Sequence, residues 1–194
     1  MEYIFRNFDE LLGANGLSDQ LLKNHFTLYQ GYVANTNKVI NKLNSLLKEG
    51  STGTPEYAEL KRRFGWEWNG MRLHENYFDN LSKVGNSIDT TSALANTIVT
   101  NFGSIENWEK DFKSTGMLRG IGWVALYQDP ESKQLFNTWI NEHETGHISG
   151  GSLLLIMDVF EHAFMIDYGL KRAEYIEVFF NNIDWKVVSN RFKR

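Results

Sequence analysis

Residues 18–50 read SDQLLKNHFTLYQGYVANTNKVINKLNSLLKEG and carry a long run of helical periodicity. Ser18 is a residue type that caps helix N-termini, and Gly50 is one at which helices stop. Between them, one face of the segment repeats at steps of three, four or seven residues, which is the spacing of an α-helix. The members of this face are Leu21, His25, Leu28, Tyr32, Val39, Leu43 and Leu46. We therefore expect a single long helix across this stretch.

A second helix is predicted directly after the first. Thr54 and Pro55 form a cap followed by a first-turn proline, and helical spacing continues to about Leu81. Because only a short turn separates two long helices, we expect them to pack as an antiparallel hairpin. We assign this hairpin to an N-terminal domain, residues 1–85. The inner face of the second helix carries Leu60, Phe64, Trp68, Met71, His74, Phe78 and Leu81.

The second half of the chain has a different character. Short helices are expected over residues 91–100 and 105–113, and a helical segment is expected after Asp158. Between them lie three strand-like runs separated by turn residues, namely GWVALYQ (122–128), QLFNTWI (134–140) and SLLLIMD (152–158). The prediction is an α+β fold. The hairpin packs on a C-terminal α/β domain, residues 86–194, with a small antiparallel sheet of about three strands and flanking helices.

Composition excludes several classes of protein. Of the 194 residues, 42% are hydrophobic and 23% are charged, as in ordinary folded domains, so a disordered or fibrous protein is excluded. The chain has no cysteine, which excludes disulfide scaffolds and thiolate zinc sites. A net charge of −4 gives no indication of a nucleic-acid partner. The longest apolar run, Leu153–Met157, is too short to span a bilayer, and residues 1–10 lack the apolar region of a signal peptide. We expect a cytoplasmic protein with no membrane partner.

The histidines suggest where chemistry could occur. A single histidine on an apolar helix face is most often a hydrogen-bonded core residue. Here His25 and His74 lie near the middle of two faces that are expected to pack together, and His162 lies four residues after Asp158. A buried aspartate at the end of an apolar strand requires a cation or several hydrogen-bond donors. Three imidazoles and one carboxylate suit manganese, iron, zinc or copper, and spacing alone does not choose among these metals.

The segment DVFEHAF, residues 158–164, resembles the metal-binding signature of the iron/manganese superoxide dismutase family, D-x-W-E-H-A-(Y/F), with Phe160 in place of the tryptophan. FGSIENWEKDF and GIGWVALY are similar to two further segments of that family, and YQGYVANTN and LHENYF to its two ligand helices. The resemblance spans about Leu17 to Phe192. It implies one iron or manganese ion per subunit, with a solvent molecule in the fifth position and superoxide as the substrate. The implied metal ligands are His25, His74, Asp158 and His162.

The resemblance also implies roles for residues around the metal. Tyr32 would be the substrate gateway, and aromatic walls would be formed by Phe78, Trp123 and Phe160. Arg172 is the candidate for drawing the anion to the entrance. In the family, the residue matching Glu161 pairs with a ligand histidine of the other subunit, which implies a homodimer; a tetramer stays open.

Family members also place a side-chain donor against the metal-bound solvent. In some it is a glutamine four residues before the second histidine ligand, a position that is Gly70 here. His143 lies fifteen residues before Asp158, where one branch of the family carries a histidine, and it is therefore the predicted donor. His147, four residues later, receives no role from the sequence.

Two departures from the family pattern stand out. The family usually has eight residues from the first ligand to the gateway tyrosine, whereas the step from His25 to Tyr32 is seven. A further histidine usual between them is missing from the region of Leu28, and its tyrosine partner across the dimer contact is replaced by Met165. Because both members of the pair are absent together, neither leaves an unsatisfied polar group behind.

Two alternatives belong to other functional classes. One is an inactive protein that keeps the superoxide dismutase fold as a structural or binding module. The other is a hydrolase with a zinc site of three histidines and one aspartate. The sequence favours the dismutase over both, and it does not distinguish iron from manganese.

Overall fold

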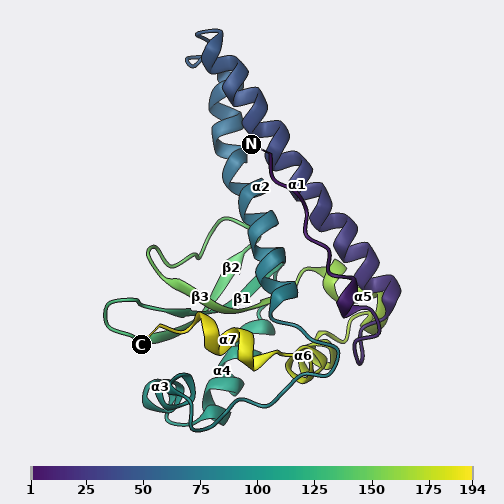
Figure 1. Cartoon of the computed structure of the whole chain (residues 1–194), viewed down its shortest axis with the longest axis vertical. Coiled ribbons are helices and arrows are strands. Elements are labelled where there is room, and N and C mark those ends of the chain that lie inside the picture. Colours follow the sequence, from purple (N-terminus) through teal and green to yellow (C-terminus); the bar gives the residue numbers. More distant parts are fainter. Residues whose placement is uncertain (1, 194) are drawn as a thin grey trace.

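The computed structural model describes residues 2–193. Helices α1 (Asp19–Lys48) and α2 (Pro55–Asp79) run antiparallel, and Figure 1 shows the hairpin projecting well beyond the rest of the molecule. Ser18 and Thr54 cap them, since the side-chain oxygen of each accepts a hydrogen bond from the backbone amide three residues later, that of Leu21 or Tyr57. The predicted hairpin is therefore confirmed. Part of the expected inner face is only half-buried: Leu28 and Tyr32 in α1, and Leu60, Phe64 and Trp68 in α2. Beside Leu28, Tyr29 is fully buried instead.

The second half forms the predicted three-stranded antiparallel sheet. Its strands are β1 (Gly122–Gln128), β2 (Leu135–Asn141) and β3 (Ser152–Asp158), in the order β2-β1-β3. The central strand β1 is buried along its whole length, whereas the edge strand β2 is partly exposed. In this register Trp123 lies opposite both Ile140 and Asp158, so the last residue of β3 sits beside the first aromatic ring of β1.

Helices cover the sheet and complete the C-terminal lobe. Helical structure after Asp158 is confirmed, but it is divided into short pieces rather than one segment. One break falls at Gly169, whose φ of +54° ends α5 in a conformation that favours glycine. The helices of the lobe are α3 (Ala93–Phe102), α4 (Ile105–Gly116), the short 3₁₀-helix η2 (Glu161–Ala163), α5 (Met165–Tyr168), α6 (Arg172–Asn181) and α7 (Trp185–Arg191), and a further 3₁₀ turn, η1 (Asp9–Leu11), precedes α1.

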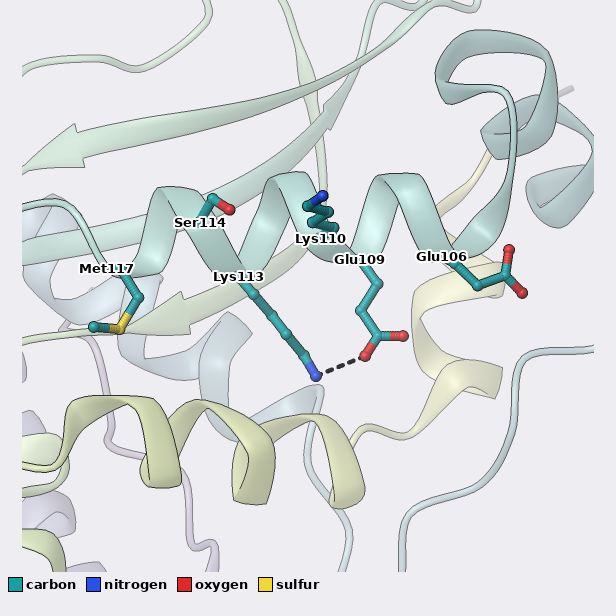
Figure 2. A pocket seen from close by; sticks show the side chains of 6 residues that line it. All are labelled: Glu106, Glu109, Lys110, Lys113, Ser114 and Met117. Atoms are coloured by element: carbon teal, nitrogen blue, oxygen red, sulfur yellow. Dashed lines mark ion pairs between the residues drawn. The ribbon is translucent and has the colours of Figure 1, made fainter.

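Helices α4 and α6 pack through aromatic rings and are joined at the surface by an ion pair. Phe112 stacks nearly parallel to Phe179 in the buried layer. Above it, Lys113 Nζ lies 2.7 Å from Glu109 and 2.5 Å from Glu177, and Figure 2 shows the first of these pairs. The shallow groove drawn there is lined by α4 and the residue after it, and it contains none of the predicted site residues.

Buried polar contacts fix the end of α2 against the lobe. Asn80, the residue after α2, donates a 2.7 Å hydrogen bond to the carbonyl of Ile156 in β3. The guanidinium of Arg191 in α7 donates to Asn80 Oδ1 and to the carbonyl of Leu154. Because unpaired buried polar groups are costly, these contacts fix one relative placement of helix and strand. His74, six residues before Asn80, is therefore held at a set distance from Asp158.

None of the described helices is long and apolar enough to cross a membrane.

Candidate metal centre

The four predicted metal ligands lie together in the space between the hairpin and the lobe. His25 comes from α1, His74 from α2, Asp158 from the end of β3 and His162 from η2. One possible ligand atom from each residue lies within 4.8 Å of all the others. The Nε2 atoms of His25, His74 and His162 lie 3.1, 3.7 and 3.2 Å from the same atom, Oδ2 of Asp158. Two long helices, a strand end and a 3₁₀-helix thus direct four ligand atoms to one point.

The hydrogen bonds of the ligands fit a metal ion. Nδ1 of His74 lies 2.5 Å from the carbonyl of Gly70. Because a carbonyl only accepts, this nitrogen carries the proton and Nε2 presents its lone pair to the centre of the site. Within the described residues, this buried Nε2 has no hydrogen-bond partner. A histidine that donates from one ring nitrogen to a backbone carbonyl and leaves the other nitrogen free is the usual arrangement of a metal ligand.

Electrostatics also match this set of ligands. Burial lowers the pKa of His25 and lowers that of His74 well below the ordinary value, so both rings are neutral and able to coordinate. Burial acts to raise the pKa of Asp158, but its interactions with the imidazoles of His162 and His25 outweigh burial, and the pKa of Asp158 lies well below its usual range. The other carboxylate oxygen accepts a 2.8 Å hydrogen bond from the amide of Phe160. One oxygen is therefore fixed by backbone while the other faces the imidazoles.

The three predicted aromatic residues contact the ligand rings. Phe78 lies edge-on to His25 with ring centroids 5.0 Å apart, and Trp123 lies edge-on to His74 at 5.0 Å. Phe160 stacks on His162 at 5.3 Å. The side chains of His25, His74 and Asp158 are fully buried, whereas that of His162 is 25% exposed. Of the four ligands, only His162 is therefore reached by solvent.

Tyr32 and His143, both predicted from the family resemblance, are hydrogen-bonded to each other. The ring of Tyr32 stacks on His74 at 5.2 Å, and its hydroxyl lies 2.8 Å from Nε2 of His143. A Cβ atom at Gly70 would lie 2.4 Å from the ring of Tyr32, so glycine is required there for the tyrosine to reach this position. Gly70 thus makes room for Tyr32, and His143 arrives from the loop between β2 and β3.

The proton positions in this pair follow from Trp123. Its indole Nε1 is only a donor, and it lies 3.0 Å from Nδ1 of His143, which must therefore accept. Burial lowers the pKa of His143 to about 4, so the ring is neutral near pH 7 and carries its proton on Nε2. That proton is donated to the oxygen of Tyr32. Burial raises the pKa of Tyr32 to about 12, so this tyrosine keeps its own proton, which is free to point elsewhere.

Tyr29 lies next to Leu28, in the region where the additional histidine of the family is missing. It points inward, donates a 3.0 Å hydrogen bond to Glu75 and accepts one from the amide of Arg6. Its buried hydroxyl is thus satisfied within the subunit. Met165, at the place of the tyrosine partner, is 39% exposed.

Two arginines near the site differ in how their guanidinium groups are engaged. Arg172 donates to the carbonyls of Leu118 and Gly120 at 2.8 and 2.9 Å, and its attraction of the anion stays a prediction. Arg63 is a residue that sequence reasoning missed. Its Nε lies 2.8 Å from the buried carboxylate of Glu67, and its Cζ lies 5.0 Å from the ring of Trp66.

Trp66 in turn contacts His143, with ring centroids 4.9 Å apart. Arg63 therefore lies one side chain away from the Tyr32–His143 pair, and its own side chain is 48% exposed. The i, i+4 spacing of Arg63 and Glu67 on the helix that carries His74 is the signal that could have identified it.

Comparison with known proteins gives a single result. Residues 90–191, more than half of the chain, match the family model for the C-terminal domain of iron/manganese superoxide dismutases. The chain belongs to the iron/manganese superoxide dismutase family. A superoxide dismutase [Fe] from Cupriavidus metallidurans is 36% identical to this dismutase over 182 residues, which cover 91% of the chain and 89% of the relative. A superoxide dismutase [Mn] 2 from Haloferax volcanii is 32% identical over 179 residues, which cover 92% of the chain and 88% of the relative.

The predicted superoxide dismutase activity is confirmed, with a mononuclear iron or manganese site formed by three histidines and one aspartate. The reaction converts superoxide to dioxygen and hydrogen peroxide. An inactive scaffold and a zinc hydrolase, the two alternatives, do not account for the family membership together with an intact ligand set.

Proposed function

We propose that Tyr32 and His143 form the proton-donating pair of this dismutase and that Trp123 sets the direction in which they donate. When bound, the iron or manganese ion supplies one-electron oxidation and reduction by alternating between its trivalent and divalent states. The proposal rests on one observation: the continuous hydrogen-bonded chain from Trp123 Nε1 through both nitrogens of His143 to the hydroxyl of Tyr32.

This chain determines which atom gives up a proton. The oxygen of Tyr32 accepts from His143, so its own hydrogen is directed away from the histidine and toward the pocket. Formation of one hydrogen peroxide molecule from two superoxide ions consumes two protons. Tyr32 is partly exposed, so water can return the proton that it gives up. A hydrogen bond from His143 stabilises the tyrosine oxygen at the moment the proton leaves.

The aromatic residues exclude bulk water from the ligands. Phe78, Trp123 and Phe160 each contact one imidazole, and between them they cover the hairpin side, the sheet side and the rim of the pocket. In a dry pocket the hydrogen bonds of Tyr32 and His143 are stronger than they would be in water. These rings therefore support the proton-donating pair as well as the fold.

We further propose that this dismutase is a cytoplasmic homodimer. A groove of about 460 Å³ next to Glu161 is lined by apolar and charged residues, including Met117, Leu118 and Met165. Leu170, on its border, is 91% exposed, which is unusual for a large apolar side chain unless a partner covers it. Glu161 is exposed beside the ligand His162 and can reach a second copy. Sedimentation should show a dimer that dissociates in Leu170→Glu, and a monomeric wild type would contradict this part of the proposal.

The proton-donating pair is tested with three proteins. Wild type should contain stoichiometric iron or manganese and consume superoxide. Asp158→Ala should lose both the metal and the activity. Tyr32→Phe should keep the metal, but its turnover should fall by about 10-fold or more, since a positioned proton donor typically contributes at least that much. Elemental analysis and a superoxide-consumption assay give both readouts. A Tyr32→Phe protein that turns over like wild type at saturating superoxide would refute the pair, whatever the metal content.

A further inference from the structure

The loop that carries His143 is held in place by side chains outside the metal centre. It spans residues 142–151 and connects β2 with β3. The main-chain carbonyl of His143 accepts two hydrogen bonds, one of 2.7 Å from Nδ2 of Asn69 and one of 3.0 Å from Nε2 of His147. Asn69 belongs to α2, so the hairpin and the loop meet at the residue whose ring faces Tyr32.

His147 connects this carbonyl to the sheet. Because a carbonyl only accepts, Nε2 of His147 must carry a proton. In the neutral ring Nδ1 is then an acceptor, and it lies 3.1 Å from the hydroxyl of Tyr127, which donates to it. Tyr127 lies on the central strand β1 and is only 4% exposed, so its position is fixed by the core. The imidazole of His147 thus joins the sheet to the loop, and Asn69 joins the hairpin to the same carbonyl.

The backbone of the loop requires such support. Glu142 has a φ of +50°, a conformation that residues with a side chain rarely adopt, and Gly146 has a φ of +110°. A Cβ atom at Gly146 would lie 2.1 Å from the carbonyl of Trp139, so the chain turns back tightly against β2 there. This turn brings residue 147 back to the carbonyl of residue 143. A loop with these conformations depends on side-chain hydrogen bonds to keep one shape.

We propose that His147 is a positioning residue for the reaction: by holding the carbonyl of His143 against the sheet, it sets where the His143 ring meets Tyr32. The inference rests on the proposed proton-donating pair. The ring nitrogen and the hydroxyl are 2.8 Å apart, and a hydrogen bond weakens steeply when its donor–hydrogen–acceptor angle becomes strongly bent. Among the described residues, the imidazole of His147 hydrogen-bonds to Tyr127 and to the carbonyl of His143, so its effect on the reaction passes through His143.

The test compares four variants, each as the metal-loaded full chain. His147→Ala should keep its metal but lose about 10-fold in turnover, as is usual when an outer hydrogen bond that orients a site is removed. His147→Gln, which still offers an N–H group, should recover most of that loss. Tyr127→Phe should lie between them because it removes only the anchor of the imidazole. Glu144→Ala, an exposed residue of the same loop, is the control and should behave as wild type.

A second readout separates positioning from general destabilisation. Azide binding, followed by the visible absorption of the oxidised protein, reports on the surroundings of the metal independently of turnover. We expect an altered azide affinity in His147→Ala, restored in His147→Gln, with metal content unchanged. If His147→Ala matches wild type in turnover and azide affinity, or if its loss follows metal content alone, the inference is wrong.

The double variant Tyr32→Phe/His147→Ala distinguishes this inference from the proposal beneath it. If His147 acts through the pair, its removal should have little further effect once Tyr32 is gone, so the two losses should not multiply. If the turnover loss of the double variant equals the product of the two single losses, His147 does not act through the Tyr32–His143 pair. Equal turnover of Tyr32→Phe and wild type would instead refute the pair itself. The effect of His147 on the surroundings of the metal would then be judged from azide affinity only.

Discussion

The helical hairpin and the C-terminal lobe each supply two of the four metal ligands, but they hold them differently. His25 and His74 come from long helices, and their side chains have no solvent exposure. The lobe supplies Asp158, equally buried, and His162, which is partly exposed. The two ligands of the hairpin are therefore sealed from solvent, whereas His162 of the lobe is the one ligand that solvent reaches.

The same contrast holds for the proton-donating pair. Tyr32 lies on a regular helix, and its direction follows from the helix geometry and from the space above Gly70. His143 lies on a loop, and its position depends on Trp123, His147 and a residue of α2. Regular backbone fixes a side chain with few additional contacts, whereas a loop requires several. The lobe side should therefore be the more sensitive to changes in neighbouring residues.

Loss of one ligand from each region gives the largest expected effect. His25→Ala and His162→Ala should each reduce activity by more than the roughly 100-fold that loss of an outer hydrogen bond costs. His162→Ala should retain more metal, because water can enter the exposed position and cannot easily enter the closed one. Elemental analysis and the superoxide assay measure both quantities. Equal metal retention in the two variants would contradict the distinction between the sealed ligand of the hairpin and the accessible ligand of the lobe.

Removal of the metal should destabilise the fold, since the ion joins the two regions. With metal at about 1,000 times its dissociation constant, binding to the native state alone contributes about 4 kcal/mol to the free energy of unfolding. The chelated protein should therefore unfold several degrees below the reconstituted one in calorimetry. Identical unfolding temperatures would show that hairpin and lobe are held together without the ion.

Trp123→Phe tests the lobe side directly. Phenylalanine keeps an aromatic ring against His74 but removes the donor to Nδ1 of His143, so the proton of that histidine is no longer confined to Nε2. Turnover should fall by about 10- to 100-fold with metal retained. Trp108→Phe is the matched control, because its buried indole donates to Asn137 away from the site. It should lose stability without losing turnover, and equal turnover losses in both variants would contradict the assignment.

The two arginines provide a smaller comparison. Arg63→Gln should lower kcat/KM by up to about 10-fold at low ionic strength, and the difference should fade as salt is added, because steering of an anion is screened. Arg172→Gln should mainly lower stability, since the carbonyls of Leu118 and Gly120 lose their donors. A salt-dependent loss confined to Arg172→Gln would assign the attraction to that residue instead.

The smallest effect is expected far from the site. Glu177→Gln removes one partner of Lys113 at the surface of α4 and α6, while Glu109 still pairs with it. The free energy of unfolding should change by less than about 1 kcal/mol, the usual range for an exposed ion pair. Phe179→Ala, in the buried layer beneath, is the comparison and should cost about 3 kcal/mol or more. A larger loss from Glu177→Gln than from Phe179→Ala would reverse this ranking.

Much of the fold and the ligand set could be predicted from local patterns in the chain. Caps at Ser18 and Thr54 mark the hairpin, alternating and apolar runs mark the strands, and the segment around Asp158 and His162 resembles a known signature. In a regular helix or strand, such a pattern directly predicts the direction in which each side chain points and the spacing between side chains. The division of the chain after residue 85 stays a prediction.

By itself, the sequence determined the hairpin, the three-stranded sheet and the identity of the four ligands, because each depends on periodicity or on short motifs within one segment. Only the tertiary structure decided that Tyr32 fits over Gly70, that Trp123 fixes the proton of His143, and that Arg63 and His147 lie beside the pair. These contacts join residues far apart along the chain, and the loop that carries His143 has no periodicity from which its direction could be derived. Their geometry is set by packing between the hairpin and the lobe, which no local pattern encodes.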